Sequence, residues 1–256
     1  MKNKEFIGKN ILITGSSKGL GKMCATAFEK NGANIIACGR NNNDIKKIID
    51  SFEKPKNHRA FIGDLTKFTK INQLNDVIEE FGTLDIILHI MGGGLGKHDP
   101  LLDHVDFELL LKTNLSIGVE LNRLLIPSMI KRGQGNVLHV GSTASTQAIA
   151  SVGYNTVKAA VAAYVRSLGR ELASTGVIVT GILPGAHFAP ENSWERLVTV
   201  NPDIVKKFIE DKEPRNKLGS YKEIIPMIEF LSSDRATMMT GCCVPIDGGE
   251  SLTYDH

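Results

Sequence analysis

The chain has 256 residues, a length that a single α/β domain reaches. Its hydrophobic fraction of 42% and charged fraction of 23% exclude a chain that is mostly disordered. The net charge of +2 excludes the strong basic excess of a protein that binds nucleic acid or a membrane surface.

Short apolar runs alternate with helical periodicity along the whole chain, and most runs are apolar throughout, as in a parallel sheet covered on both faces. About seven strands are predicted, at Asn10–Thr14, Asn34–Cys38, Arg59–Ile62, Asp85–Ile90, Asn136–Val140, Val177–Ile182 and Cys243–Ile246. Six helices are predicted between them, at Leu20–Lys30, Asp44–Phe52, Lys67–Phe81, Phe107–Lys131, Gly153–Ala173 and Tyr221–Leu231. The alternation predicts a doubly wound parallel sheet with helices on both faces, in one domain over residues 1–256.

Residues 185–218 interrupt this alternation after the sixth strand, and Pro190, Pro202 and Pro214 lie within them. The part from Trp194 to Ile209 is predicted to hold one or two short helices. A long excursion beyond the carboxyl end of a strand is where an α/β fold usually places a substrate lid. We therefore predict a lid at about 185–218.

A glycine-rich segment, Thr14 to Gly21, follows the first strand and opens a helix. Glycines let the backbone approach a pyrophosphate closely, and the helix N-terminus offers free N–H groups and a positive dipole end. The alternative is a tight strand-to-helix turn without a ligand. The predicted phosphate-binding residues are Gly15, Ser17, Lys18, Gly19, Leu20 and Gly21.

The glycine spacing, Gly-x-x-x-Gly-x-Gly, resembles that of the short-chain dehydrogenase/reductase family, and the resemblance extends over nearly the whole chain. Asp64-Leu65-Thr66 resembles the adenine-pocket element of that family. Leu183-Pro184-Gly185 resembles its turn beyond the sixth strand, and Asp247-Gly248-Gly249 its closing motif. The resemblance implies a Rossmann fold and assigns Asp64, Leu65, Pro184 and Gly185 to the cofactor site.

The second predicted strand bears on the choice of cofactor, because NAD is selected by a carboxylate and NADP by positive charge. By resemblance Gly39 occupies the place of the carboxylate, and Arg40 follows it. Lys18 of the glycine-rich loop is expected to face the same pocket. NADP(H) is therefore the preferred cofactor, and NAD(H) is the alternative. Lys18 and Arg40 could instead be solvated charges on the surface.

Tyr154 and Lys158 are four residues apart at the start of a predicted helix, which puts both on one face. An ammonium beside a phenol is expected to bring the tyrosine pKa toward neutrality. Ser142 follows the fifth strand, and Asn114 falls inside a predicted helix, where asparagine is a poor former. Taken singly, each has an ordinary structural explanation. Tyr154 and Lys158 could be a pair on a helix surface, Ser142 a residue of a turn, and Asn114 a polar residue bonded to its own backbone.

Together these four residues match the catalytic set of the family in order and approximate spacing. The resemblance implies that Tyr154 exchanges a proton with the substrate oxygen and that Ser142 orients and polarises that oxygen. Lys158 would bind the nicotinamide ribose, and Asn114 would hold a water that links Lys158 to solvent.

Two segments depart from the family pattern. His89-Ile90-Met91-Gly92 stands where the family shows Asn-Asn-Ala-Gly, although Gly92 still allows close approach to a cofactor. His89 either replaces an asparagine or is a core histidine bonded to backbone, which is favoured. Ala189 stands where a threonine often anchors the carboxamide, and His187 is a candidate substrate contact.

These observations predict an NAD(P)-dependent oxidoreductase that reduces a ketone or aldehyde, with a sugar or nucleotide sugar of surface-glycan biosynthesis as one substrate class. The alternatives are an enzyme similar to the 3-oxoacyl-(acyl-carrier-protein) reductases and a non-catalytic dinucleotide-binding regulator. The predicted partner is a small carbonyl or alcohol, with no nucleic acid, membrane or metal. A homo-oligomer, dimer or tetramer, is expected through the apolar faces of Phe107–Lys131 and Gly153–Ala173.

Four cysteines are too few for a disulfide framework, and two of them, Cys242 and Cys243, are neighbours. Cys24 and Cys38 are expected to pack as small core residues. The first residues carry no apolar stretch long enough for a leader, and no run of about 18 apolar residues occurs. We therefore expect a cytoplasmic location.

Overall fold

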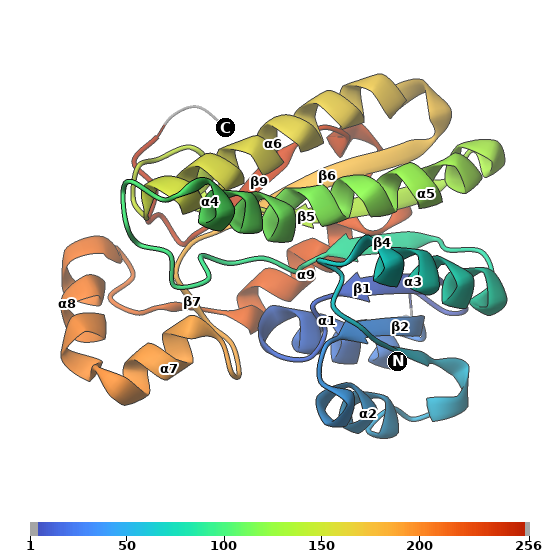
Figure 1. Cartoon of the computed structure of the whole chain (residues 1–256), viewed down its shortest axis with the longest axis horizontal. Coiled ribbons are helices and arrows are strands. Elements are labelled where there is room, and N and C mark those ends of the chain that lie inside the picture. The colour runs from blue at the N-terminus through green and yellow to red at the C-terminus, as the bar shows by residue number, and fades with distance from the viewer. Residues whose placement is uncertain (1–4, 254–256) are drawn as a thin grey trace.

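Seven parallel strands form the central sheet of the computed structural model, which describes residues 5–253 (Figure 1). The strand order is β3-β2-β1-β4-β5-β6-β9, so the order reverses between β1 and β4. A reversal of this kind opens a crevice at the carboxyl ends of the strands. The strands are β1 Asn10–Thr14, β2 Asn34–Gly39, β3 Arg59–Ile62, β4 Ile86–His89, β5 Gly135–Val140, β6 Val177–Pro184 and β9 Cys243–Ile246.

Helices cover both faces of the sheet, as the sequence predicts for strands that are apolar throughout. They are α1 Gly19–Lys30, α2 Asn42–Asp50, α3 Phe68–Phe81, α4 His104–Leu111, α5 Ile117–Arg132, α6 Val152–Leu172 and α9 Tyr221–Leu231. Short 3₁₀ segments lie at Pro55–Asn57, Thr143–Ser145, Ala173–Thr175 and Asp234–Met239. Within residues 5–253, no helix combines the length and the hydropathy needed to cross a bilayer.

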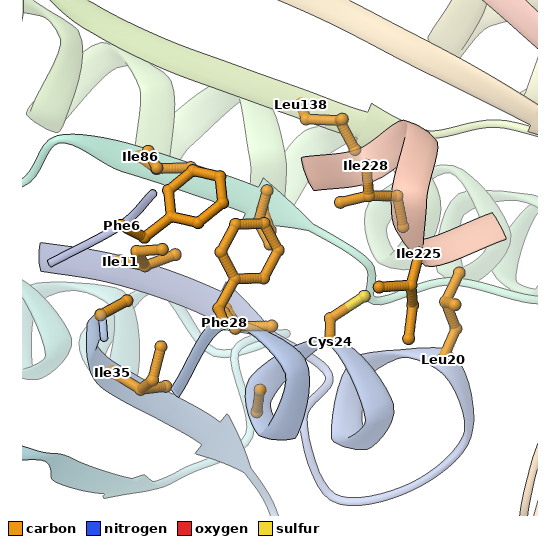
Figure 2. Packing of buried hydrophobic residues seen from close by; sticks show 14 of the residues in the cluster. Phe6, Ile11, Leu20, Cys24, Phe28, Ile35, Ile86, Leu138, Ile225 and Ile228 are labelled. Atoms are coloured by element: carbon orange, nitrogen blue, oxygen red, sulfur yellow. The ribbon is translucent and has the colours of Figure 1, made fainter. Parts of the chain in front are cut away.

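The core divides into one apolar layer on each face. Figure 2 shows the layer under α1 and α9, where Cys24 and Phe28 of α1 pack near Ile225 and Ile228 of α9. The second layer lies under α3, α5 and α6. Cys38 belongs to that second layer, and both Cys24 and Cys38 are buried and free, as predicted.

One predicted helix is wrong as a single element. The stretch Phe107–Lys131 divides into α4, a π-helical turn at Lys112–Ser116 and α5. The cause lies at Asn114, because its amide nitrogen donates to the carbonyl of Leu110, 2.9 Å away, in competition with the backbone ladder. Outside this helix and the lid, each predicted strand or helix bound lies within two residues of the bound in the structure.

The segment after β6 forms a lobe of its own at one end of the molecule (Figure 1). It contains helices α7 Ser193–Val200 and α8 Pro202–Lys212, which meet through the rings of Trp194 and Phe208, 4.7 Å apart. A two-stranded parallel pair, β7 His187–Phe188 and β8 Gly219–Ser220, closes its base. The two helices were expected and the small sheet was not.

Candidate active site

The glycine-rich loop between β1 and α1 is folded so tightly that only glycine fits at two positions. A Cβ on Gly21 would lie 2.2 Å from the carbonyl oxygen of Gly15. Gly15 itself has φ +70° and lies directly against Met91, where a Cβ would come 3.0 Å from Cα. Glycine at these two positions is therefore required by the close packing of the loop itself.

The first turn of α1 carries no acidic residue, and Lys18 at its N-cap provides no side-chain cap. The N–H of Gly19 donates to the carbonyl of Pro190 in the lid segment, 2.8 Å away. A helix N-terminus with uncapped N–H groups and a positive dipole end suits a pyrophosphate. Leu20 is buried beneath this turn, whereas the Lys18 side chain is exposed.

The carboxyl ends of β2 and β3 bring Arg40 close to Asp64. Burial alone would raise the pKa of Asp64, but hydrogen bonds from Thr66 and the charge of Arg40 bring it below its usual range. Arg40 is exposed and available to an anionic group. Leu65 is buried in the core layer beneath.

The turn after β4 joins Asn114 to the glycines that follow His89. The side chain of Asn114 accepts from the N–H of Gly93 at 2.9 Å and donates to the carbonyl of Gly93 at 3.0 Å. A Cβ on Gly92 would lie 2.7 Å from Asn114 Oδ1 and 3.3 Å from Lys158 Nζ. Gly92 is therefore the point at which the predicted asparagine and lysine come together.

Ser142, Tyr154 and Lys158 gather on the other side of that turn. The side chain of Ser142 lies within hydrogen-bonding reach of Tyr154. The Lys158 ammonium lies over the tyrosine ring, 5.6 Å from its centroid, and donates to the carbonyl of Val140 at 2.9 Å. The four residues matched to the catalytic set thus lie in one place, at the carboxyl edge of β4 and β5.

The predicted downward shift of the tyrosine pKa is not found. Burial raises the pKa of Tyr154 above its ordinary value, and the hydrogen bond with Ser142 offsets only part of that rise. Burial also lowers the pKa of Lys158, to about 8. Tyr154 is therefore a neutral phenol at neutral pH, the form that can donate a proton.

His89 is buried, but its partner is a side chain and not the backbone that was favoured. Its Nε2 lies 2.8 Å from Oδ1 of Asn122 on α5. The backbone at this strand end is held instead by Thr14, whose hydroxyl accepts from the N–H groups of Ile90 and Met91. Sequence reasoning missed both Asn122 and Thr14, although an asparagine between the apolar residues of α5 was a usable signal.

The first residues of the lid segment contact the end of β9 and the first turns of α1. Gly185 donates its N–H to the carbonyl of Ile246 at 3.2 Å, and Nδ1 of His187 lies 2.9 Å from the carbonyl of Gly185. Glu191 pairs with Lys22 of α1 at 3.1 Å. Ala189 is fully buried, so it offers only its backbone to the site.

Comparisons with known proteins agree with this geometry. The family model described as short chain dehydrogenase matches residues 9–201. The 3-oxoacyl-(acyl-carrier-protein) reductase of Salmonella typhimurium is 29% identical over 248 residues, covering 95% of this chain and 98% of its own. A structure of L-sorbose reductase from Gluconobacter frateurii, complexed with NADPH and L-sorbose, has a TM-score of 0.89 at 25% identity, covering 98% of this chain and 99% of its own.

A structure of 7α-hydroxysteroid dehydrogenase, complexed with NADH and 7-oxo glycochenodeoxycholic acid, has a TM-score of 0.87 at 26% identity. It covers 98% of each chain. The two structural neighbours thus carry different nicotinamide cofactors on the same seven-stranded architecture.

Proposed function

Since the chain belongs to the short chain dehydrogenase family, we propose that it reduces the carbonyl group of a small ketone or aldehyde, with Tyr154 as the general acid. The observation that carries the proposal is the convergence of Ser142, Tyr154 and the buried Lys158 in one place. A non-catalytic dinucleotide-binding protein has no use for a neutral phenol paired in this way.

The nicotinamide cofactor, when bound, supplies the hydride, and the residues of this chain hold and polarise the carbonyl. Tyr154 donates its phenolic proton to the substrate oxygen, and Ser142 donates a hydrogen bond to the same oxygen. Lys158 remains mostly cationic at neutral pH with its pKa of about 8, and binds the nicotinamide ribose. Asn114 holds the turn at Gly93 and orders the water that links Lys158 to solvent.

NADPH is the preferred donor in this proposal. Arg40 is exposed at the end of β2, and Gly39 before it brings no carboxylate to the ribose 2′-hydroxyl. The NADPH complex of the Gluconobacter enzyme supports this choice, whereas the NADH complex of the hydroxysteroid dehydrogenase keeps NADH as the alternative.

The preferred substrate class is a small polar carbonyl compound, with sugars and nucleotide sugars first. Support comes from the L-sorbose bound in the Gluconobacter neighbour and from the polar side chains interleaved in the lid at Glu191, Asn192 and Glu195. The second candidate is reduction of a 3-oxoacyl thioester, favoured by the identity with the Salmonella reductase. Parallel assays with a ketose and with an acetoacetyl thioester distinguish the two.

The test begins with a titration of the purified protein with NADPH and then NADH, followed by Trp194 emission. Tight NADPH binding and turnover of a carbonyl compound are expected. Tyr154→Phe should abolish turnover and leave NADPH binding nearly unchanged, because it removes only the donated proton. Retained turnover in that variant, or a folded protein that binds neither cofactor, would overturn the proposal.

Self-association forms part of the proposal. Apolar side chains remain exposed along α4 and α5, with Val105 at 60%, Leu109 at 38% and Val119 at 37%. Large exposed apolar patches mark interaction sites, and we infer that these side chains contribute to one. Light scattering on the purified protein is expected to give a dimer or tetramer, and a monomer at micromolar concentration would contradict it.

A further inference from the structure

Two buried histidines lie side by side beneath the candidate active site. His89 ends β4 and His139 lies near the end of β5, and the two are direct register partners. Their rings stack with centroids 4.3 Å apart and planes at 27°. Because the exposed fractions are only 6% and 2%, neither ring exchanges protons freely with solvent.

The side chain of Asn122 on α5 joins the two imidazoles. Its Oδ1 lies 2.8 Å from Nε2 of His89, and its Nδ2 lies 3.1 Å from Nε2 of His139. The same Nδ2 donates to the hydroxyl of Tyr164 on α6 at 3.1 Å. One amide therefore connects two strands and two helices.

The bridge fixes the protonation of the pair. An amide has one accepting and one donating end, so one imidazole must present N–H at Nε2 and the other a bare nitrogen. The two neutral rings consequently hold opposite tautomers. Burial lowers the pKa of His89 to about 4. Burial, His89 and the charge of Lys158 lower the pKa of His139 well below its ordinary value, so both rings are neutral.

Both strand ends lead directly into the catalytic constellation. The residue after His139 is Val140, whose carbonyl accepts from the ammonium of Lys158. The chain beyond His89 enters the turn that Asn114 binds, and α5 begins immediately after the π-helical turn that carries Asn114. A shift of α5 against β4 and β5 would therefore move Asn114 and Lys158 relative to each other.

We propose that Asn122 is a positioning residue, which locks His89 and His139 as a neutral pair and thereby sets the placement of Lys158 and Asn114. The pair also keeps a second positive charge away from Lys158. The expected effect on turnover rests on the proposed function. The expected tautomers of the two histidines do not depend on it. Gly118 completes the fit, since a Cβ there would lie 3.0 Å from His139 Cε1.

The first test is imidazole NMR of the ¹⁵N-labelled protein, which needs no turnover. One of the two buried rings should carry its proton on Nε2 and the other on Nδ1, without titration between pH 6 and 8. In Asn122→Leu, which is similar in volume and apolar, this fixed pattern should be lost. Lys158 should also titrate above its value of about 8 in that variant, because a loosened anchor admits water. Identical tautomers, or an unchanged pattern and unchanged Lys158 in Asn122→Leu, would overturn the proposal.

The second test is kinetic. Asn122→Leu should lower kcat about tenfold and leave the KM for NADPH within about twofold, because the phosphate and adenine contacts lie elsewhere. Asn122→Asp should move the acid limb of the kcat profile to higher pH, because a carboxylate favours protonation of both imidazoles. The other charged and titratable groups facing the pair are Lys158 and Tyr164 of α6.

The matched control is Asn136, a buried asparagine at the opposite end of β5, whose Nδ2 donates to the carbonyls of Leu231 and Ser233. Asn136→Leu should lose a comparable amount of stability and keep kcat and the pH profile. Equal kinetic losses in both variants, or a folded Asn122→Leu enzyme with unchanged kcat, would reduce Asn122 to a structural residue. If the wild-type protein turns over no carbonyl compound, the proposed function fails. The NMR tautomers and the titration of Lys158 still test whether Asn122 positions the two histidines and Lys158.

Discussion

A buried carboxyl group lies near the end of the lid, and its ionisation destabilises the folded protein. Glu213 follows α8 and is 4% exposed, and its Oε1 has no hydrogen-bond partner within residues 5–253. Burial raises its pKa from 4.5 to about 7, helped by the charges of Glu250 and Asp247 against that of Arg215. Glu250 in turn accepts from the N–H of Ala186, where the lid begins.

Glu213→Gln removes this charge and keeps the shape. The pKa of Glu213 is higher in the folded state than in the unfolded state, so the neutral carboxyl group is compatible with folding and the charged one opposes it. The free energy of unfolding is therefore highest below about pH 4.5 and falls as the pH rises to about 7. At 1.36 kcal/mol per pKa unit, the rise from 4.5 to about 7 corresponds to about 3 kcal/mol. The glutamine variant does not lose this stability. It should therefore be more stable than the wild type by up to that amount at pH 8, and by less than about 1 kcal/mol at pH 5.

Urea unfolding followed by circular dichroism at pH 5 and pH 8 measures both differences. Glu210→Gln is the matched control. Glu210 lies on α8, three residues before Glu213, in an exposed pair with Lys206, and its substitution should change stability by less than about 0.5 kcal/mol. If Glu213→Gln changes the free energy of unfolding equally at both pH values, the carboxyl group is already ionised or solvated at pH 5 and the reasoning fails.

Three further predictions concern the site. Gly92→Ala should lower kcat by about a hundredfold or more, since its Cβ would lie 2.7 Å from Asn114 Oδ1, and steady-state kinetics on the folded variant would measure it. Arg40→Ala should weaken NADPH binding at least about tenfold and NADH binding little, as equilibrium titration with each cofactor would show. Glu191→Gln should change NADPH affinity less than about threefold, because its pair with Lys22 is exposed.

The fold could be predicted from the sequence because its signals are local. Buried parallel strands such as β1 have an unbroken apolar centre, Ile11 to Ile13, and a capping box of Ser220 and Glu223 stands at the start of α9. The division of Phe107–Lys131 could not be predicted, because periodicity is nearly the same on both sides of the π-helical turn. The turn carries Asn114, whose side chain bonds both the carbonyl of Leu110, four residues earlier, and Gly93, which is distant in sequence.

The residues of the candidate site also fall into a group that the sequence predicts and a group that it does not. Gly15, Gly21, Ser142, Tyr154 and Lys158 lie in short motifs whose spacing is informative, and the structure brings the last three together. The partners that hold the motifs in place are ordinary residues.

Asn122 belongs to no motif, and Thr14 opens the glycine-rich segment without a predicted role of its own. Each acts through a contact with the end of β4 or the residue after it, which forms only when the chain folds. The pKa of Tyr154 was mispredicted for the same reason. Spacing revealed the neighbouring ammonium, whereas the burial that outweighs it is a property of the whole fold.

That burial determines how the proton moves in the proposed reduction. The pKa of Tyr154 lies above its ordinary value of 10.0, and that of Lys158 is about 8, so the phenol holds its proton more tightly than the ammonium does. Once Tyr154 has given its proton to a substrate oxygen, reprotonation by Lys158 is therefore favourable. Tyr154 is thus restored to its acid form from within the site, and the slower exchange with solvent falls to Lys158, which is 3% exposed and bonded to Val140.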